Sequence, residues 1–537
     1  MESACRIGRL GVDDFFYIAL SAFLFAVSHP NVLLRNGFPL CAFFFMTPVF
    51  FVLRRSSLKK SFLFGCFHGF IFYLLFAYWA FYNYRELYLL ALVLLSVCTG
   101  VVFLCMSLLS RWYERWCFYI MALVWCVFEY LRTLGPLGLS YGIAGYTQWK
   151  NPLMLSVSSV TGIWGVSFFC VCTSACVADI WRCAREKKRL SFRFFMLPSV
   201  LTVIFAVCVC CSLWQWKTFS AQNMRTIRVV AVQNNTDSRK YNGDVYKRDI
   251  RMLEQLTKEA LEVHPDADFV IWPETAVVPP IVYHYGAKVD FSRYNTIYDM
   301  LLFMSDSDVA FVLGNQHSVA GDSGRKDYNA ALVFDGKGAC IPPSPEVYEK
   351  IHLVPFSESL PFFHLLKPVY DIVVKDRSRY WEAGKDFRVF ETKGVAFSTP
   401  ICFEDTFGSF CRQYVKNGAQ VLFNLSNDSW SASSVCQRQH LSMAVFRSSE
   451  NCIPSVRSTA SGISCVISSD GKVVVQAEEF APTWVYGELA VPELPVSNSQ
   501  RGSFYTRYGD FFAVVQVILV SLLFLLRLAK TVKNGVL

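Results

Sequence analysis

In Gly394-Val395-Ala396-Phe397-Ser398-Thr399-Pro400-Ile401-Cys402-Phe403-Glu404, a hydrophobic strand-like segment ends in a thiol and a carboxylate. A second run of the same kind, Asp268-Phe269-Val270-Ile271-Trp272-Pro273-Glu274, also ends in a carboxylate. The ends of strands are where active-site groups gather in α/β sheets. These two runs therefore predict an α/β domain and make Glu274 and Cys402 candidates for its active site.

Strand-like and helix-like stretches alternate on both sides of these runs, which supports an α/β domain with a core of its own. The helical pattern is strongest at about 244–264, 292–304 and 434–451. Expected strands are Thr226–Asn235, Ala267–Thr275, Val309–Ser318, Asn329–Phe334, Gly394–Asp405, Ala419–Asp428 and a final pair near Ser455–Ser468 and Lys472–Gln476.

Hydrophobic segments flank this polar region, and the composition is that of a membrane protein: 53% of the 537 residues are hydrophobic and only 17% are charged. Runs long enough to cross a bilayer predict about eight transmembrane helices, near 14–29, 38–53, 61–82, 87–110, 116–134, 154–180, 194–216 and 508–528. We expect a membrane domain with seven helices at 1–216, an exterior α/β domain at 217–500, and a last helix with a cytoplasmic tail at 501–537.

Lysine and arginine residues indicate the orientation, because they are retained on the cytoplasmic side of a membrane. The loops on one side hold only Arg35, Arg85, Arg132 and Lys150. The other side holds far more: Arg6, Arg9, Arg54, Arg55, Lys59, Lys60, Arg111, Arg115, Arg182, Arg185, Lys187, Lys188, Arg189, Arg193, Arg527, Lys530 and Lys533. This asymmetry predicts that both termini are cytoplasmic and that the polar region lies outside.

Much of the excess behind the net charge of +9 lies in those retention loops, and we expect no nucleic-acid partner. Most of the 20 cysteines lie in the hydrophobic part, where they are small apolar fillers. The others lack the spacing of a zinc site. We expect no metal and no cofactor, and we expect a monomer.

Lys350 completes a set of three groups that suits acyl transfer at a cysteine. A free thiol is only slightly ionised at neutral pH, so it needs a base or a cation nearby. Glu274 can be that base and Lys350 that cation. A fixed positive charge also stabilises the oxyanion of a tetrahedral intermediate.

At these positions the chain resembles the nitrilase superfamily, which has a Glu-Lys-Cys triad in this order and an αββα sandwich fold. More closely it resembles the apolipoprotein N-acyltransferase family, the membrane-embedded branch, over nearly its whole length. The matching stretches are Trp272-Pro273-Glu274-Thr275, the run from Tyr348 to Glu358, Ile401-Cys402-Phe403-Glu404, Gln439-His440-Leu441, Arg447, Glu450, Arg457-Ser458-Thr459 and Gly462.

The resemblance implies that Glu274 is the general base, Lys350 the oxyanion partner and Cys402 the nucleophile. Glu358 and Glu404 would be supporting carboxylates. The chain departs from the family at Phe403, where a tyrosine is usual, which puts the role of that hydroxyl in doubt.

The reaction implied is transfer of an acyl chain from a membrane phospholipid, through a Cys402 thioester, to the N-terminal α-amine of the diacylglyceryl-cysteine of an apolipoprotein. Its place would be the exterior face of a bacterial inner membrane. The alternatives are a nitrilase-like amidase or hydrolase tethered to the membrane, and a transporter or structural membrane protein with an exterior domain.

An apolar run, Leu360-Pro361-Phe362-Phe363-His364-Leu365-Leu366, directly follows Glu358. Such a run in an exterior loop is expected either as a lid over an acyl-chain site or as a patch that packs on the domain itself. Phe362, Phe363 and Leu366 are the candidate lid residues.

Overall fold

The computed structural model describes residues 12–186, 192–220, 223–236, 245–321, 324–336, 338, 340–363, 365, 367–368, 380–494 and 502–533. The chain divides into two compact units. One consists of Met1–Leu134, Leu139–Trp214 and Tyr508–Leu537, and the other of Gly135–Gly138 and Gln215–Arg507. We call them the helical unit and the sandwich unit.

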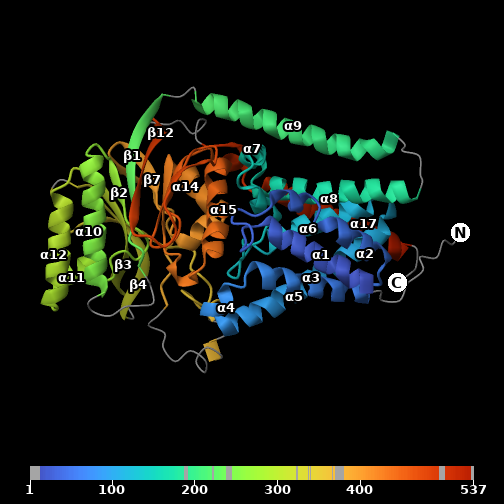
Figure 1. Ribbon diagram of the computed structural model, residues 1–537, viewed down its shortest axis with the longest axis horizontal. Helices are drawn as coiled ribbons and strands as arrows, with labels where there is room; N and C mark the ends of the chain where they lie inside the picture. The colour runs from blue at the N-terminus through green and yellow to red at the C-terminus, as the bar shows by residue number, and fades with distance from the viewer. Residues whose placement is uncertain are drawn as a thin grey trace. The chain divides into compact units, whose positions relative to one another are not determined.

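The helical unit is built from apolar helices (Figure 1). Within the described residues, five helices are long and apolar enough to cross a membrane: 58–76, 85–112, 163–185, 195–219 and 511–532. The helices are α1 (Val12–Ser28), α2 (Met46–Arg55), α3 (Leu58–Phe76), α4 (Ala80–Asn83), α5 (Arg85–Trp112), α6 (Cys117–Leu131), α7 (Pro152–Thr161), α8 (Ile163–Arg185), α9 (Phe192–Ser220) and α17 (Phe511–Lys533), with 3₁₀ turns η1 (Pro39–Phe43), η2 (Glu114–Trp116) and η3 (Ala144–Gln148).

Three more of the expected spans coincide with shorter helices. α1 has 17 residues, α6 has 15 and α2 has 10. A helix rises about 1.5 Å per residue, so the shortest of these covers about half of a hydrocarbon core. The number of eight spans remains a prediction.

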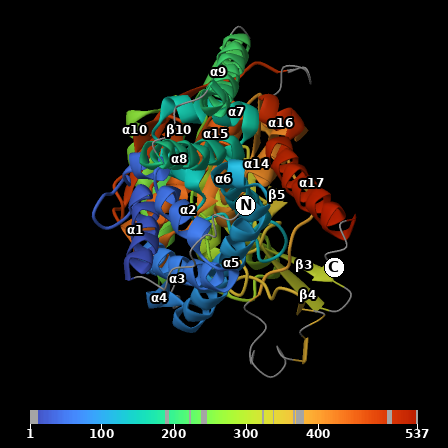
Figure 2. The same ribbon diagram turned by 90° about the vertical axis from the view of Figure 1, so that its right-hand side faces the viewer.

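Glycines let α3 and α5 pack closely, side by side in Figures 1 and 2. A Cβ atom on Gly65 would lie 2.5 Å from the backbone oxygen of Thr99, and one on Gly100 would lie 2.5 Å from the sulfur of Cys66. Small residues at such contacts are how apolar helices associate when lipid offers no hydrophobic driving force.

The sandwich unit contains two six-stranded sheets, in the orders β12-β1-β2-β3-β4-β5 and β11-β10-β9-β8-β7-β6. The strands of the first sheet are β1 (Met224–Gln233), β2 (Phe269–Ile271), β3 (Ala310–Gly321), β4 (Gly324–Phe334), β5 (Glu346–Glu349) and β12 (Thr483–Pro492). Those of the second are β6 (Phe390–Thr392), β7 (Val395–Ser398), β8 (Val421–Ser426), β9 (Ser455–Thr459), β10 (Cys465–Ile467) and β11 (Val473–Gln476).

The sheets pack face to face and helices cover their outer faces, so the unit is an αββα sandwich (Figure 1). Alternation along the strands produces this layering. Val229 and Phe269 belong to the apolar core that they share with Phe397 of the second sheet. Val230 and Trp272 belong to a second core, between the first sheet and the helices that cover it. The helices are α10 (Val245–Val263), α11 (Ile281–Ala287) and α12 (Phe291–Ser305) on the first sheet, α14 (Gly408–Asn417) and α15 (Ser434–Asn451) on the second, and a short α16 (Phe504–Tyr508).

Several expected strands are shorter than predicted. The segment Ala267–Thr275 is strand only as β2. The segment 394–405 is strand only as β7, after which Cys402–Thr406 forms a 3₁₀ turn, η4. Pro400 lacks the N–H that a sheet ladder needs, and Cys402 has φ 48°, which a strand does not adopt. The segment 455–468 is two antiparallel strands, β9 and β10, rather than one.

Candidate functional site

Glu274 lies just beyond the end of β2, in a segment that rests directly on β3. Its carboxyl group is buried, and the next residue, Thr275, has a positive φ of 53°. Gly314 of β3 makes this approach possible, because a Cβ atom there would lie 2.6 Å from the Cα atom of Glu274 and 2.4 Å from the backbone nitrogen of Thr275. The position of Glu274 therefore requires a residue without a side chain at position 314.

Gly314→Ala should destabilise the protein by about 2 kcal/mol or more, because backbone atoms on both sides leave the new methyl no room. Acyl transfer should fall with it, since Glu274 would be displaced. Gly286→Ala is the matched control: nothing lies within 4 Å of a Cβ atom at that helical position, and alanine is the better helix former. Thermal unfolding and turnover of both variants measure the effect, and a native-like Gly314→Ala protein would contradict it.

Lys350 follows the last residue of β5 and is completely buried. Its Nζ atom donates hydrogen bonds to Oε1 of Glu358 at 2.8 Å and to Oε1 of Glu274 at 3.2 Å. Burial by itself would lower the pKa of Lys350, but the two carboxylates more than offset this and raise the pKa above its usual value. The side chain is therefore a permanent ammonium held between two acids.

Asn329, in the middle of β4, also joins the two carboxylates. Its side-chain nitrogen donates to Oε1 of Glu274 at 2.8 Å and to Oε1 of Glu358 at 3.1 Å. Burial raises the pKa of Glu274, while Lys350 and Asn329 oppose that rise. The sequence pattern does not identify Asn329, because there it is only the polar residue directly before the apolar run 330–334.

Cys402 begins the η4 turn directly after the strand-like segment of β7. Its left-handed backbone, at φ 48°, is uncommon for a residue with a Cβ atom and is found where surrounding contacts impose it. Burial raises the pKa of the Cys402 thiol well above its usual value, the charge of Glu274 adds to the rise, and Lys350 opposes it. The thiol is thus neutral at rest, and both Glu274 and Lys350 act on it electrostatically.

Glu404 connects the segment around Lys350 to the turn that carries Cys402. One carboxylate oxygen accepts from the hydroxyl of Tyr348 at 2.7 Å and from the backbone nitrogens of Ile351 and His352 at 2.8 and 3.0 Å. The other accepts from the backbone nitrogen of Ile401 at 2.7 Å. A single buried carboxylate therefore fixes the residues next to Lys350 and the residue next to Cys402.

Phe403 and the apolar run lie at the edge of this cluster. The Phe403 ring stacks on His352, with ring centroids 5.4 Å apart. Phe362 is 48% exposed and has φ 54°, and Phe363 is half-buried. Leu366 lies outside the described residues, so the structure does not test the expected lid.

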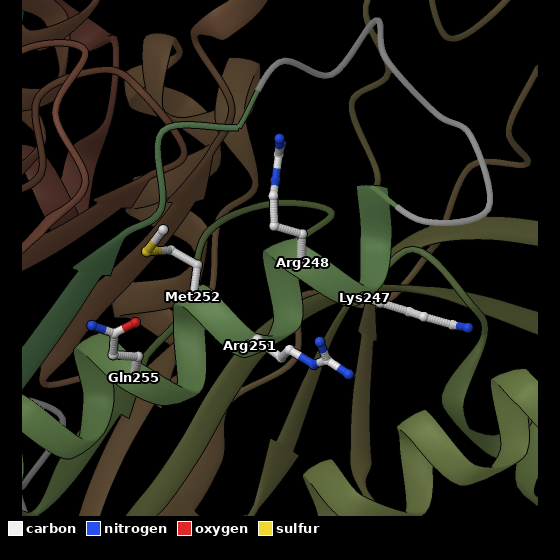
Figure 3. Close-up of a pocket in the computed structure, with 5 residues that line it drawn as sticks. All are labelled: Lys247, Arg248, Arg251, Met252 and Gln255. Carbon is white, nitrogen blue, oxygen red and sulfur yellow. The ribbon is translucent and has the colours of Figure 1, made fainter.

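A separate hollow of about 320 Å³ opens beside α10. Lys247, Arg248, Arg251, Met252 and Gln255 line it, all from that one helix (Figure 3). It shares no residue with the Glu274, Lys350 and Cys402 cluster. In the part of the chain that the structure describes, no three His, Cys, Asp or Glu side chains are grouped so that they could hold a metal ion.

Comparisons with known proteins cover nearly the whole chain. The family model described as carbon-nitrogen hydrolase matches residues 228–494, and the one described as apolipoprotein N-acyltransferase N-terminal domain matches residues 21–176. Apolipoprotein N-acyltransferase 1 of Treponema denticola is 36% identical over 94% of this chain and 94% of its own length. The protein of the same name from Treponema pallidum is 35% identical over 97% of this chain and 96% of its own. Apolipoprotein N-acyltransferase 2 of Treponema denticola is 28% identical over 97% and 99%.

These matches include both units of the chain and run over the three positions at which the buried acid, ammonium and thiol meet. The chain therefore belongs to the apolipoprotein N-acyltransferase family, the membrane branch of the carbon–nitrogen hydrolases.

Proposed function

We propose that this protein moves an acyl chain from a membrane phospholipid to the N-terminal α-amine of the diacylglyceryl-cysteine of an apolipoprotein. The observation that carries the proposal is the buried ammonium of Lys350 between Glu274 and Glu358, with its charge acting on the Cys402 thiol. The relatives' names support the lipoprotein acceptor.

In the first half of the proposed reaction, the sulfur of Cys402 attacks the ester carbonyl carbon of the phospholipid. Because the thiol is neutral at rest, its proton passes to Glu274 as the S–C bond forms. The raised pKa of Glu274 makes it a better proton acceptor than an ordinary glutamate. Lys350 stabilises the oxyanion of the tetrahedral intermediate. The C–O bond then breaks, and the lysophospholipid oxygen takes the proton from Glu274.

In the second half, the acceptor amine attacks the thioester carbonyl carbon. An α-amine has a pKa near 7.7–8.0, so a useful fraction is neutral and nucleophilic. The amine's proton passes to Glu274 and from there to the sulfur of Cys402 as the C–S bond breaks, which regenerates the thiol. Water must be kept from the thioester, and a dry, apolar surrounding such as a lid formed by Phe362, Phe363 and Leu366 would do this.

Glu358 and Glu404 are proposed as positioning residues. Glu358 accepts from Lys350 and also from the backbone nitrogen of Val354, at 2.8 Å, so it holds the ammonium against its own loop. Glu404 keeps the Lys350 segment and the Cys402 turn at a fixed separation.

We further propose a bacterial inner-membrane location, with a seven-helix membrane domain at 1–216, an exterior catalytic domain at 217–500 and a last helix within 501–537. The asymmetry of lysine and arginine between the loops supports this orientation. A reporter fused near residue 320 that is active only in the cytoplasm would contradict it.

The purified protein in detergent–phospholipid micelles should N-acylate a synthetic diacylglyceryl-cysteine peptide only when phospholipid is present. Mass spectrometry would show the peptide heavier by one acyl chain, together with an equal amount of lysophospholipid. Release of free fatty acid at the same rate with and without the peptide would instead indicate a hydrolase. The matched control is the N-acetylated peptide, which has no free amine and should stay unmodified.

A further inference from the structure

Four charged side chains form a second buried group, which includes a residue of the η4 turn that also carries Cys402. They are Asp405 of η4, Asp428 just beyond β8, His440 of α15 and Arg457 of β9, and all four are buried. We call them the charge quartet. Its two acids and two bases come from four different elements, so the fold assembles it and no local sequence pattern reveals it.

His440 lies between the two acids. Its Nε2 atom is 2.8 Å from Oδ1 of Asp405, and its Nδ1 atom is 2.9 Å from Oδ1 of Asp428. A carboxylate only accepts hydrogen bonds, so each ring nitrogen must donate one, and a histidine that donates from both nitrogens is an imidazolium. Burial by itself would lower the pKa of His440, but Asp428 and Asp405 raise it to about 9.

Arg457 supplies the second positive charge, so that each of the two carboxylates is matched by one cation. One of its terminal nitrogens pairs with Asp405, and the other lies 3.6 Å from Oδ2 of Asp428. The quartet therefore has two negative and two positive charges and is neutral. Arg447 and Glu450, also on α15, pair with each other at 3.0 Å and do not alter this balance.

The quartet reaches Cys402 by two routes. Asp405 belongs to the same η4 turn, three residues after the thiol. Asp428 accepts a hydrogen bond at 3.1 Å from the hydroxyl of Ser426, which itself interacts with the Cys402 side chain. Gly462 leaves the space that the Asp428 carboxylate occupies, because a Cβ atom at position 462 would lie 2.7 Å from Oδ2 of Asp428.

Charged groups that act on the thiol include Glu274, Lys350, Asp428 and Arg457. Asp428 has the same sign as a thiolate and opposes its formation. We propose that His440 is a positioning residue whose positive charge, held by Asp405 and Asp428, cancels the opposition of Asp428 and makes Cys402 easier to deprotonate. The inference deepens the proposed function, because it assumes that Cys402 is the reacting thiol.

Two single substitutions and their combination test this by charge alone. His440→Gln removes one positive charge and leaves the quartet at −1. Asp428→Asn removes one negative charge and leaves it at +1, since His440 keeps its bond to Asp405 and so its proton. The double variant is neutral again. A role in folding alone would not give effects of opposite sign.

The readout is the pH dependence of Cys402 alkylation by iodoacetamide in the full-length protein, followed by mass spectrometry of the Cys402 peptide. Only the thiolate is alkylated. The midpoint should rise by about one unit in His440→Gln and fall by about one unit in Asp428→Asn, as expected for one nearby charge. In the double variant it should return close to the native value. One unit is a tenfold change in thiolate below the midpoint.

Unchanged midpoints, or shifts in the same direction in both single variants, would overturn the proposal. If His440→Gln cannot be recovered folded, Asp428→Asn decides by itself, because only a downward shift agrees with the proposal. Alkylation requires no acyl transfer, so this result stands apart from the test of the proposed function. A protein that shows the opposite shifts but N-acylates nothing would keep the inference and reject the function.

Discussion

Cys402→Ala should lower acyl transfer by at least about ten-thousand-fold, because removal of a catalytic nucleophile abolishes both halves of the reaction. Native protein given phospholipid without an acceptor should gain the mass of one acyl chain, and neutral hydroxylamine should remove it, as it does from thioesters. The diacylglyceryl-cysteine peptide should discharge the same adduct onto its amine. Cys402→Ser should also lose nearly all turnover, since a hydroxyl is much harder to ionise than a thiol.

Cys340→Ala is the matched control for this result. Cys340 is equally buried but belongs to the core under α10 and α12, so its loss should leave the adduct and the turnover intact. Normal turnover in Cys402→Ala would falsify the thioester mechanism.

The rate of adduct formation should also fall as the pH decreases through the raised pKa of Glu274, because the protonated acid can no longer accept the proton of the thiol.

Lys350→Met should have the second largest effect, on stability as well as on chemistry. It removes the ammonium and leaves Glu274 and Glu358 facing each other in the interior, both of them bound to Asn329. Breaking a buried ion pair from one side typically costs about 3–5 kcal/mol. The two acids should then share a proton, so Glu274 stops acting as a base, and acyl-Cys402 should not form.

A second substitution separates these two effects. Lys350→Met combined with Glu358→Gln removes one acid along with the ammonium, so most of the lost stability should return. The acyl adduct should still be absent, because the oxyanion has lost its cation. Denaturant unfolding and intact-mass measurement report the two properties independently. Adduct formation in the double variant would show that Lys350 acts through stability alone.

The sequence reveals the proposed reacting groups more readily than it reveals their surroundings. Glu274 and Cys402 each follow a strand-like run, and Lys350 stands in a long motif, so local patterns are enough to find them. Asn329 reaches the acids only through the register of β4 with β5. The members of the charge quartet meet one another only through the order of strands in the second sheet. Contacts between residues far apart in the chain leave no local pattern.

How well the sequence predicts each strand and its ends depends on how the apolar residues are distributed along the strand. Apolar runs predict β1, β3 and β8 closely, because β8 is buried throughout and β1 and β3 are buried on both faces over 229–233 and 310–315. β12 was not predicted, because Gly487 and Glu488 interrupt its apolar residues. Apolar character extends past the end of β7 to Ile401, so hydrophobicity alone could not show that the strand stops at Ser398 and a turn begins at Cys402.

The pairing of β1 with β12 bears on the biosynthesis of this protein. The first strand of the sandwich unit, β1, is hydrogen-bonded along its whole length to the last, β12, and Met224 lies opposite Pro492. A ribosome makes the chain from one end, so β1 has no partner on that edge until nearly the entire unit has been synthesised. Closing so long a loop is slow compared with forming local contacts. In the newly made chain this edge of the first sheet therefore stays open until β12 has been synthesised and has paired with β1.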